Sequence, residues 1–358
     1  MRRLSKIQKL NSDYGQAPED SFSLSFWKKE TMNVSDFRDH PVFICGHPKS
    51  GTSLLRSLLD SHPEVVAYPE ETVFFRRFLP AAKGCLPAEK MELADRLLTH
   101  IFEWNKDNPP AHQSGHPDRT YTQFPASQVR ARVRERLNEQ YRHDGDILSA
   151  VILAFGDVAG QRTDATRFWL EKTPYNEYFA KEIFGWWQQA RCIHVIRDPR
   201  DNFVSYRRKH PDWDAEVFAH NWWRSTKAGL SNQARYGHER YFLISYEEFT
   251  QNPEEMLKQI CDFLGIRDDQ TLRIPTRAGD AWQGNSMFSN KFSGISAAAV
   301  GRWENTLKTE DLAVIEWTNR TLMTTLDYQL STEKPKVSPS IRWRMLKKRI
   351  YTELRRNK

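Results

Sequence analysis

Short apolar runs alternate with amphipathic stretches along most of the chain. Four segments contain runs of strand length, namely PVFICG (41–46), RFWLEKTPYN (167–176), RCIHVI (191–196) and RYFLISYEEF (240–249). Helical spacing of apolar residues follows, as in TSLLRSLLDSH (52–62), YFAKEIFGWWQQA (178–190) and PEEMLKQICDFLGI (253–266). This alternation predicts an α/β fold, a parallel sheet sandwiched by helices with ligands at the carboxyl ends of the strands.

The same pattern divides the chain into parts. Residues 1–40 are polar without sustained periodicity and form an extension, and residues 41–330 form the core domain. Within it, residues 76–165 are predicted to be a mostly helical insertion, a suitable place for a lid or substrate site. Residues 331–358 are a basic tail, in which Ile341, Met345, Ile350 and Leu354 form an approximate apolar stripe. The stripe fits an amphipathic helix on a membrane or acidic partner, and equally a helix docked on the domain.

Composition narrows the class of partner and the compartment. The net charge of +7 favours an acidic partner, such as a polyanionic substrate, a nucleotide, a membrane surface or nucleic acid. The four cysteines have no paired spacing and are predicted to be buried thiols in a reducing compartment. The N-terminus has no apolar signal region, and no run of about 18 apolar residues occurs. We therefore expect a cytoplasmic protein.

A loop of small and polar residues separates the first predicted strand from the first helix. In GHPKSGTS, Gly46 and Gly51 have the spacing of the P-loop motif, but Thr52 stands where that motif has its lysine. The lysine here is Lys49, two residues before the second glycine. A strand, a glycine-bearing turn and a helix N-terminus aim backbone N–H groups at one point. We therefore predict a modified, P-loop-like site for a phosphate or sulfate.

A second anion signal lies at the end of the strand at 191–196. Arg197 follows that strand, Asp198 and Pro199 are suited to begin a helix, and Ser205 falls about two turns into it. A guanidinium at a strand end and a hydroxyl of the next helix can converge on one phosphate.

Together the two signals resemble a known family. PKSGTSLL after a strand, and VIRDPRDNFVSY with eight residues from Arg197 to Ser205, resemble the nucleotide-binding signatures of sulfotransferases that use 3′-phosphoadenosine 5′-phosphosulfate (PAPS). PEETVFF, EKTPYN and VGRWENTL are similar to segments of the bacterial and carbohydrate- or protein-modifying branch. The resemblance covers about residues 41–325. It implies that the first loop holds the 5′-phosphosulfate, and that Arg197 and Ser205 hold the 3′-phosphate.

The resemblance also implies roles in sulfuryl transfer to a hydroxyl or amine. Lys49 is expected at the bridging oxygen, and donors come from Ser50, Gly51, Thr52 and Ser53. Near the end of the core, the segment expected to close over the nucleotide contains Lys291, Gly301, Arg302 and Trp303. Ala299 stands where relatives often have a serine.

Candidates for proton transfer lie in two further segments. The resemblance points to Glu71 as the base, with Glu70 behind it, and to Lys172 for stabilising the transferring group, with Thr173 assisting. Adjacent residues of an extended segment point to opposite sides, so only one of the two glutamates is expected to face the site. Partial desolvation beside the apolar VFF would make Glu71 the better base.

Two other function classes stay open. A P-loop nucleotide kinase or NTPase would explain the first loop, but the lysine after Gly51 and a Walker B aspartate are absent. A non-enzymatic polyanion-binding module would fit the charge but leaves both phosphate signatures unexplained. No clustered carboxylates or histidines suggest a metal, and no motif suggests nucleic acid. The acceptor is expected to be a carbohydrate, a glycolipid or a peptide.

Overall fold

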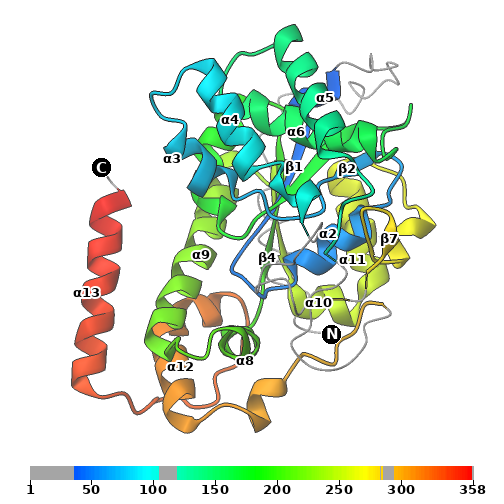
Figure 1. Cartoon of the computed structure of the whole chain (residues 1–358). Coiled ribbons are helices and arrows are strands. Elements are labelled where there is room, and N and C mark those ends of the chain that lie inside the picture. The colour runs from blue at the N-terminus through cyan, green and yellow to red at the C-terminus, as the bar shows by residue number, and fades with distance from the viewer. Residues whose placement is uncertain (1–35, 105–118, 283, 285–293, 357–358) are drawn as a thin grey trace, which may run out of the picture.

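The centre of the molecule is a parallel sheet, as the sequence predicts. The computed structural model describes residues 36–104, 119–282, 284 and 294–356. In them, five parallel strands lie in the order β2-β3-β1-β4-β5 (Figure 1). They are β1 (Pro41–Cys45), β2 (Val65–Ala67), β3 (Phe168–Lys172), β4 (Arg191–Ile196) and β5 (Tyr241–Ser245). The three-residue β2 was not predicted, because so short a run shows no periodicity.

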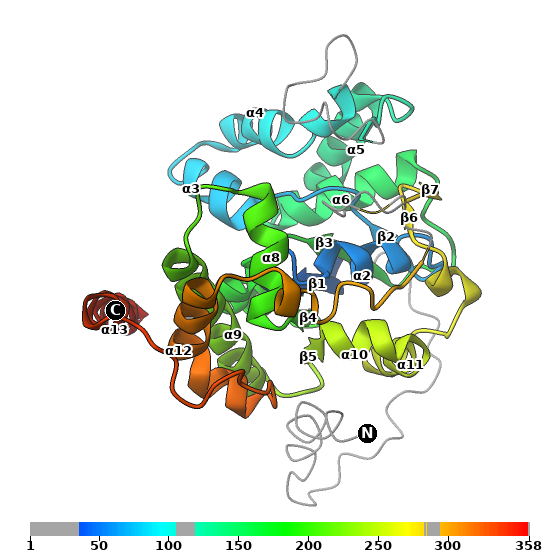
Figure 2. The same ribbon diagram turned by 90° about the horizontal axis from the view of Figure 1, so that it is seen from below.

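Helices cover both faces of this sheet, so the predicted α/β sandwich is confirmed (Figures 1 and 2). On β1, Val42 and Ile44 pack into one apolar cluster while Phe43 and Cys45 pack into the other, as expected where side chains alternate across a sheet buried on both sides. The first cluster includes residues of α2 (Thr52–Leu59), α10 (Tyr246–Gln251) and α11 (Pro253–Leu264). The second includes residues of α6 (Gly145–Val158), α7 (Ala180–Trp186), α8 (Pro199–Lys209), α9 (Ala215–Tyr236) and α12 (Thr309–Thr325).

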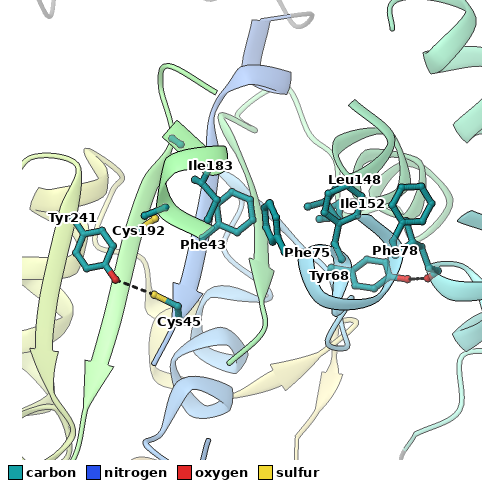
Figure 3. Packing of buried hydrophobic residues seen from close by; sticks show 14 of the residues in the cluster. Phe43, Cys45, Tyr68, Phe75, Phe78, Leu148, Ile152, Ile183, Cys192 and Tyr241 are labelled. Atoms are coloured by element: carbon teal, nitrogen blue, oxygen red, sulfur yellow. Dashed lines mark hydrogen bonds between the residues drawn. The ribbon is translucent and has the colours of Figure 1, made fainter. Parts of the chain in front are cut away.

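The segment between β2 and β3 is mostly helical in its described part. It contains η3 (Phe74–Phe78), α3 (Leu79–Ala81), α4 (Pro87–Leu97), η4 (His100–Glu103), α5 (Ala126–Glu139) and α6. Figure 3 shows Phe75 and Phe78 of this segment lying near Leu148 and Ile152 of α6 within the same apolar cluster as Phe43. The insertion therefore extends the main core instead of forming a separate one.

The strand order makes the carboxyl edge beside β1 the expected place for a ligand. From β1 the chain runs to β2 and β3 on one side of it, and then crosses to β4 on the other side. In open α/β sheets such a reversal leaves a crevice at the carboxyl ends of the strands. Both predicted phosphate segments, 46–53 after β1 and 197–205 after β4, begin at this edge.

The remaining elements complete the two ends of the domain. They are η2 (Asp36–Asp39), η5 (Asn176–Phe179), η6 (Gln270–Arg273), β6 (Thr276–Arg277), β7 (Asp280–Ala281), η7 (Arg302–Asn305) and α13 (Pro339–Arg356). Most of the predicted extension at 1–40 and residues 105–118 of the insertion lie outside the described residues. None of the described helices combines the length and the hydropathy needed to cross a bilayer.

A buried ion pair fastens the β6–β7 hairpin to α2. Asp60 accepts hydrogen bonds from Arg56 Nη1 at 3.0 Å, from Thr276 Oγ1 at 3.0 Å and from the Gly279 N–H at 2.9 Å. Arg56 and Asp60 are each 1% exposed. Removing one partner would leave the other charge buried without compensation.

We therefore predict that Asp60→Ala lowers the free energy of unfolding by about 3–5 kcal/mol, the cost typical of breaking a buried pair. Urea denaturation would measure the change. Glu135→Ala, which breaks the exposed Arg132–Glu135 pair of α5, is the control and should leave the transition where it is. Equal transitions for both variants would contradict the anchoring role of Asp60.

Candidate active site

The loop from β1 to α2 depends on glycine at both ends. Gly46 has a φ of 129°, and a Cβ there would lie 2.4 Å from the carbonyl oxygen of Val195. Gly51 has a φ of 101°, and a Cβ there would lie 2.4 Å from the Tyr246 ring. The loop therefore lies directly against β4 and the start of α10, where side chains would not fit.

Hydrogen bonds from the loop itself and from α8 fix its shape. Ser50 donates from both Oγ (2.6 Å) and N–H (3.2 Å) to the His47 carbonyl, and Asn202 Nδ2 donates to the Pro48 carbonyl at 3.1 Å. Both donors of Ser50 thus bond within the loop and help to shape it, while the contact of Ser50 with a bound anion stays a prediction. His47 is buried, and burial lowers its pKa to about 4.

The first turn of α2 remains suited to an anion. The helix begins at Thr52, and Gly51 provides no side-chain cap. The first N–H groups of a helix have no partner within the helix, and they lie at the positive end of its dipole. Together with Thr52 and Ser53, these groups form the donor set that the sequence predicts for a phosphate or sulfate.

Arg197 connects the two predicted phosphate segments. Its Nη1 donates to Ser205 Oγ at 3.2 Å and to the Lys49 carbonyl at 2.9 Å, and its Nη2 donates to the Ala299 carbonyl at 2.9 Å. The guanidinium also lies 4.3 Å from the centre of the Tyr246 ring. The structure therefore brings together Arg197, Ser205 and the first loop. At Ala299, where relatives often have a serine, Arg197 contacts the backbone carbonyl.

None of the ion pairs among the described residues involves Arg197, although the carboxylates of Asp201 and Glu247 interact with its charge from a greater distance. The residue is 4% exposed, its hydrogen bonds go to neutral oxygens, and its buried Nε has no partner in the described part of the chain. A buried cation whose direct contacts are all neutral is costly unless an anion compensates it, and a bound phosphate would do so at contact distance. This arrangement fits a group that carries a phosphate.

Asp201 fixes the segment that the sequence predicts to cover the nucleotide. Its carboxylate accepts the N–H of Gly301 at 2.7 Å and that of Trp303 at 2.9 Å, and Arg200 lies 3.9 Å from the Trp303 ring centre. Arg302 Nε donates to the Ala298 carbonyl at 2.8 Å. Segment 299–303 is thereby held beside Arg197, whereas Lys291 lies outside the described residues. Sequence reasoning missed Asp201, which reads as an ordinary acidic residue in the first turn of α8.

The two candidate glutamates face different partners, as predicted. Glu71 accepts a hydrogen bond from Lys172 Nζ at 2.6 Å, and its side chain is 41% exposed. Glu70 is 10% exposed, accepts a hydrogen bond from Tyr121 at 2.7 Å and lies 3.7 Å from Arg277. Glu71 therefore meets solvent and a lysine, with less desolvation than predicted, while Glu70 belongs to a buried network.

Glu171 is a second residue that sequence reasoning missed, and it positions the Glu71–Lys172 pair. The carboxylate accepts hydrogen bonds from Thr72 Oγ1 at 2.8 Å, from the Thr72 N–H at 3.2 Å and from Asn176 Nδ2 at 2.6 Å. Thr173 donates to the same carboxylate and accepts the Val73 N–H at 3.3 Å, which gives it a positioning role. Thr72 directly follows Glu71 in the chain, and Glu171 directly precedes Lys172. The hydrogen bonds between Glu171 and Thr72 therefore fix the backbone next to both members of the Glu71–Lys172 pair.

All of these parts meet at one edge of the sheet. Lys172 is paired in register with Ile44 near the end of β1, and the Tyr175 N–H donates to the Gly46 carbonyl at 3.2 Å. The Trp222 indole of α9 donates to the Arg197 carbonyl at 2.9 Å. The edge thus combines a buried guanidinium and a helix N-terminus with an exposed carboxylate, an arrangement suited to holding a phosphate-bound group beside an acceptor that the carboxylate can deprotonate.

A buried polar network supports the start of the first loop. Cys45, Glu177 and His194 place one possible ligand atom each within 4.8 Å of one another. These groups are engaged already, since Glu177 accepts the Gly46 N–H at 3.1 Å and a hydrogen bond from Ser225, and His194 Nδ1 lies 2.9 Å from the Tyr241 hydroxyl. Hydrogen bonding behind the loop accounts for this group.

Comparison with known proteins was made on the sequence and on the fold. A model described as "Sulfotransferase family" matches residues 41–270. Protein-tyrosine sulfotransferase 2 of Gallus gallus is 23% identical over 238 residues, which cover 64% of this chain and 52% of that protein. Protein-tyrosine sulfotransferase A of Caenorhabditis elegans is 24% identical over 238 residues, 64% of this chain and 51% of that protein. The chain thus spans about half the length of these curated relatives.

Solved structures share the fold. The sulfotransferase domain of the Synechococcus PCC 7002 olefin synthase matches with a TM-score of 0.52 and 22% identity, covering 81% of this chain and 96% of that domain. The sulfotransferase domain from the curacin biosynthetic pathway matches with a TM-score of 0.50 and 17% identity, covering 81% of this chain and 98% of that domain.

Glu177, which accepts the Gly46 N–H at the start of the first loop, predicts that the stability of the fold depends on pH. Burial raises the pKa of Glu177 from its ordinary value of 4.5 to about 7. The folded state therefore binds more protons than the unfolded state between these values, so this stabilising contribution is complete below pH 4.5 and is lost as the pH rises through 7. Relative to Glu177→Gln, the native chain should lose about 3 kcal/mol of unfolding free energy across that window, at 1.36 kcal/mol per pKa unit. Urea titrations at a series of pH values measure the difference, and parallel curves for the two proteins would contradict the assignment.

Proposed function

Because the chain belongs to the sulfotransferase family, as the match over residues 41–270 shows, we propose that it transfers a sulfuryl group from PAPS to an acceptor hydroxyl or amine. One observation carries the proposal. The buried Arg197 guanidinium contacts the first loop, Ser205 and segment 299–303 at once, without a direct carboxylate contact among the described residues. This arrangement supports the binding of a nucleotide that carries two separate phosphate groups.

The residues at this edge fit such a nucleotide. Arg197 and Ser205 would hold the 3′-phosphate, and the first turn of α2, with Gly51, Thr52 and Ser53, would hold the 5′-phosphosulfate. Lys49 would place its cation at the leaving phosphate. PAPS supplies an activated sulfuryl group. Segment 299–303, held by Asp201, would close over the nucleotide with Gly301, Arg302 and Trp303.

Glu71 is proposed as the base that accepts the proton of the acceptor. Its carboxylate is exposed enough to meet an acceptor, and its ion pair with Lys172 fixes its direction. Lys172 lies at the end of β3, beside the first loop, where it would stabilise charge on the group in transfer. No step in this scheme requires a metal.

We propose a carbohydrate, glycolipid or peptide as the acceptor. The two protein-tyrosine sulfotransferases that match the chain favour a tyrosine hydroxyl in a peptide as the first acceptor to test. Assays with radiolabelled PAPS against a tyrosine peptide, an oligosaccharide and a glycolipid would distinguish these three acceptors.

Nucleotide binding tests the proposal most directly. Calorimetry should detect binding of adenosine 3′,5′-bisphosphate, and Arg197→Ala should weaken it about tenfold to a hundredfold, because one charge-assisted phosphate contact is lost. Arg207→Ala on the same helix, where Arg207 pairs with Asp311, is the matched control and should bind like the native chain. Binding of ATP with magnesium in preference to the bisphosphate would instead favour a nucleotide kinase or NTPase.

The two adjacent glutamates provide a matched test of the base. Glu71→Gln keeps the shape and removes the basicity, so it should reduce turnover about a hundredfold or more at saturating PAPS, with little change in nucleotide affinity. Glu70→Gln should have a milder effect on turnover, since Glu70 faces Tyr121 and Arg277. The reverse order in steady-state assays would assign the base to Glu70, and full turnover in both variants would mean that neither carboxylate accepts the proton.

A further inference from the structure

The last helix of the described chain carries an apolar face directed away from the domain. On α13, Trp343, Leu346, Ile350 and Leu354 are 57%, 45%, 49% and 64% exposed. Their spacing of three, four and four residues places them in one stripe along the helix. The stripe differs from the one that the sequence predicts, because Met345 is fully buried and Ile341 packs against the core.

The opposite face fixes α13 to the domain. Met345 belongs to the main apolar cluster, Arg344 forms an ion pair with Glu216 of α9 at 2.6 Å, and Lys227 of α9 pairs with Glu353. Figures 1 and 2 show α13 at the outer side of the molecule, separated from the sheet by α9 and α12. The helix is therefore docked on the domain, and its exposed stripe forms part of the outer surface.

Basic side chains border the stripe. Between Pro339 and Leu354 the sequence has five basic residues and one acidic residue, Glu353. Arg342 and Lys347 are exposed, and Lys347 Nζ lies 5.0 Å from the centre of the Trp343 ring. An apolar stripe with tryptophan at one end and lysine and arginine along its borders is typical of helices that lie in the interface of a bilayer.

We propose that this face of α13 docks the protein on an anionic lipid bilayer. Leu346, Ile350 and Leu354 would enter the boundary between headgroups and acyl chains, while the aliphatic part of Lys347 would lie along that boundary with its charge at the lipid phosphates. The charge favours this occupant over a second copy of the chain, because two copies of α13 would bring their basic borders together. Contact is peripheral, through one face of one helix.

Flotation of the full chain with vesicles tests the proposal. The protein should float with vesicles of phosphatidylcholine and phosphatidylserine in equal parts, and far less with phosphatidylcholine alone or at high salt.

Ile350→Ser should weaken partitioning about fivefold by removing apolar area from the stripe. Lys347→Gln should weaken it by a similar factor by removing one cation. Ile274→Ser, at another exposed isoleucine (60%), is the matched control and should float like the native chain.

Thermal denaturation of each variant verifies that the fold is intact, which the exposure of the substituted side chains leads us to expect. Equal flotation of the Ile350→Ser variant and the native chain would overturn the proposal, as would binding that does not depend on phosphatidylserine. A dimer in sedimentation analysis that Ile350→Ser abolishes would assign the stripe to a second copy and likewise overturn it.

Discussion

The geometry of the candidate site depends on one buried guanidinium. Arg197 is removed from water at the carboxyl edge of the sheet, and its hydrogen-bond acceptors are a serine hydroxyl and two backbone carbonyls. Carbonyl dipoles orient the group, and none of the ion pairs among the described residues involves it, so the guanidinium can bind an anionic ligand directly. The same contacts join the loop after β1 to the segment at 299–303, which lie far apart in the sequence. The Arg197 guanidinium thus determines both the arrangement of these segments and the positive charge of the site.

The sequence predicted the parts of the site whose signals are local. The strand at 191–196, the N-cap at Asp198 and the eight-residue step to Ser205 can all be read within one short stretch, and each is present in the structure. The loop at 46–53 was recognisable for the same reason, since its glycines serve a turn and a helix start. Local propensity and motif spacing were sufficient for these features.

What the sequence did not predict depends on distant contacts. Asp201 holds backbone groups one hundred residues away, and Glu171 holds Thr72 from 99 residues away. Each reads locally as an ordinary charged residue, and only the folded chain shows the N–H groups that their carboxylates accept. The hydrogen bonds of Ser50 within the loop were not predicted either, because the sequence does not show which donors bond to the loop's own carbonyls.

Helix α9 connects the candidate active site to the outer helix α13. It comprises 22 residues and therefore spans about 33 Å at 1.5 Å per residue. Trp222 on this helix bonds to the backbone of Arg197, while Glu216 and Lys227 on the same helix hold α13. These contacts fix the orientation of the candidate site relative to α13. An enzyme resting on a surface through α13 would hold its active site at a constant height and angle, and would meet acceptors anchored in that surface by diffusion in two dimensions.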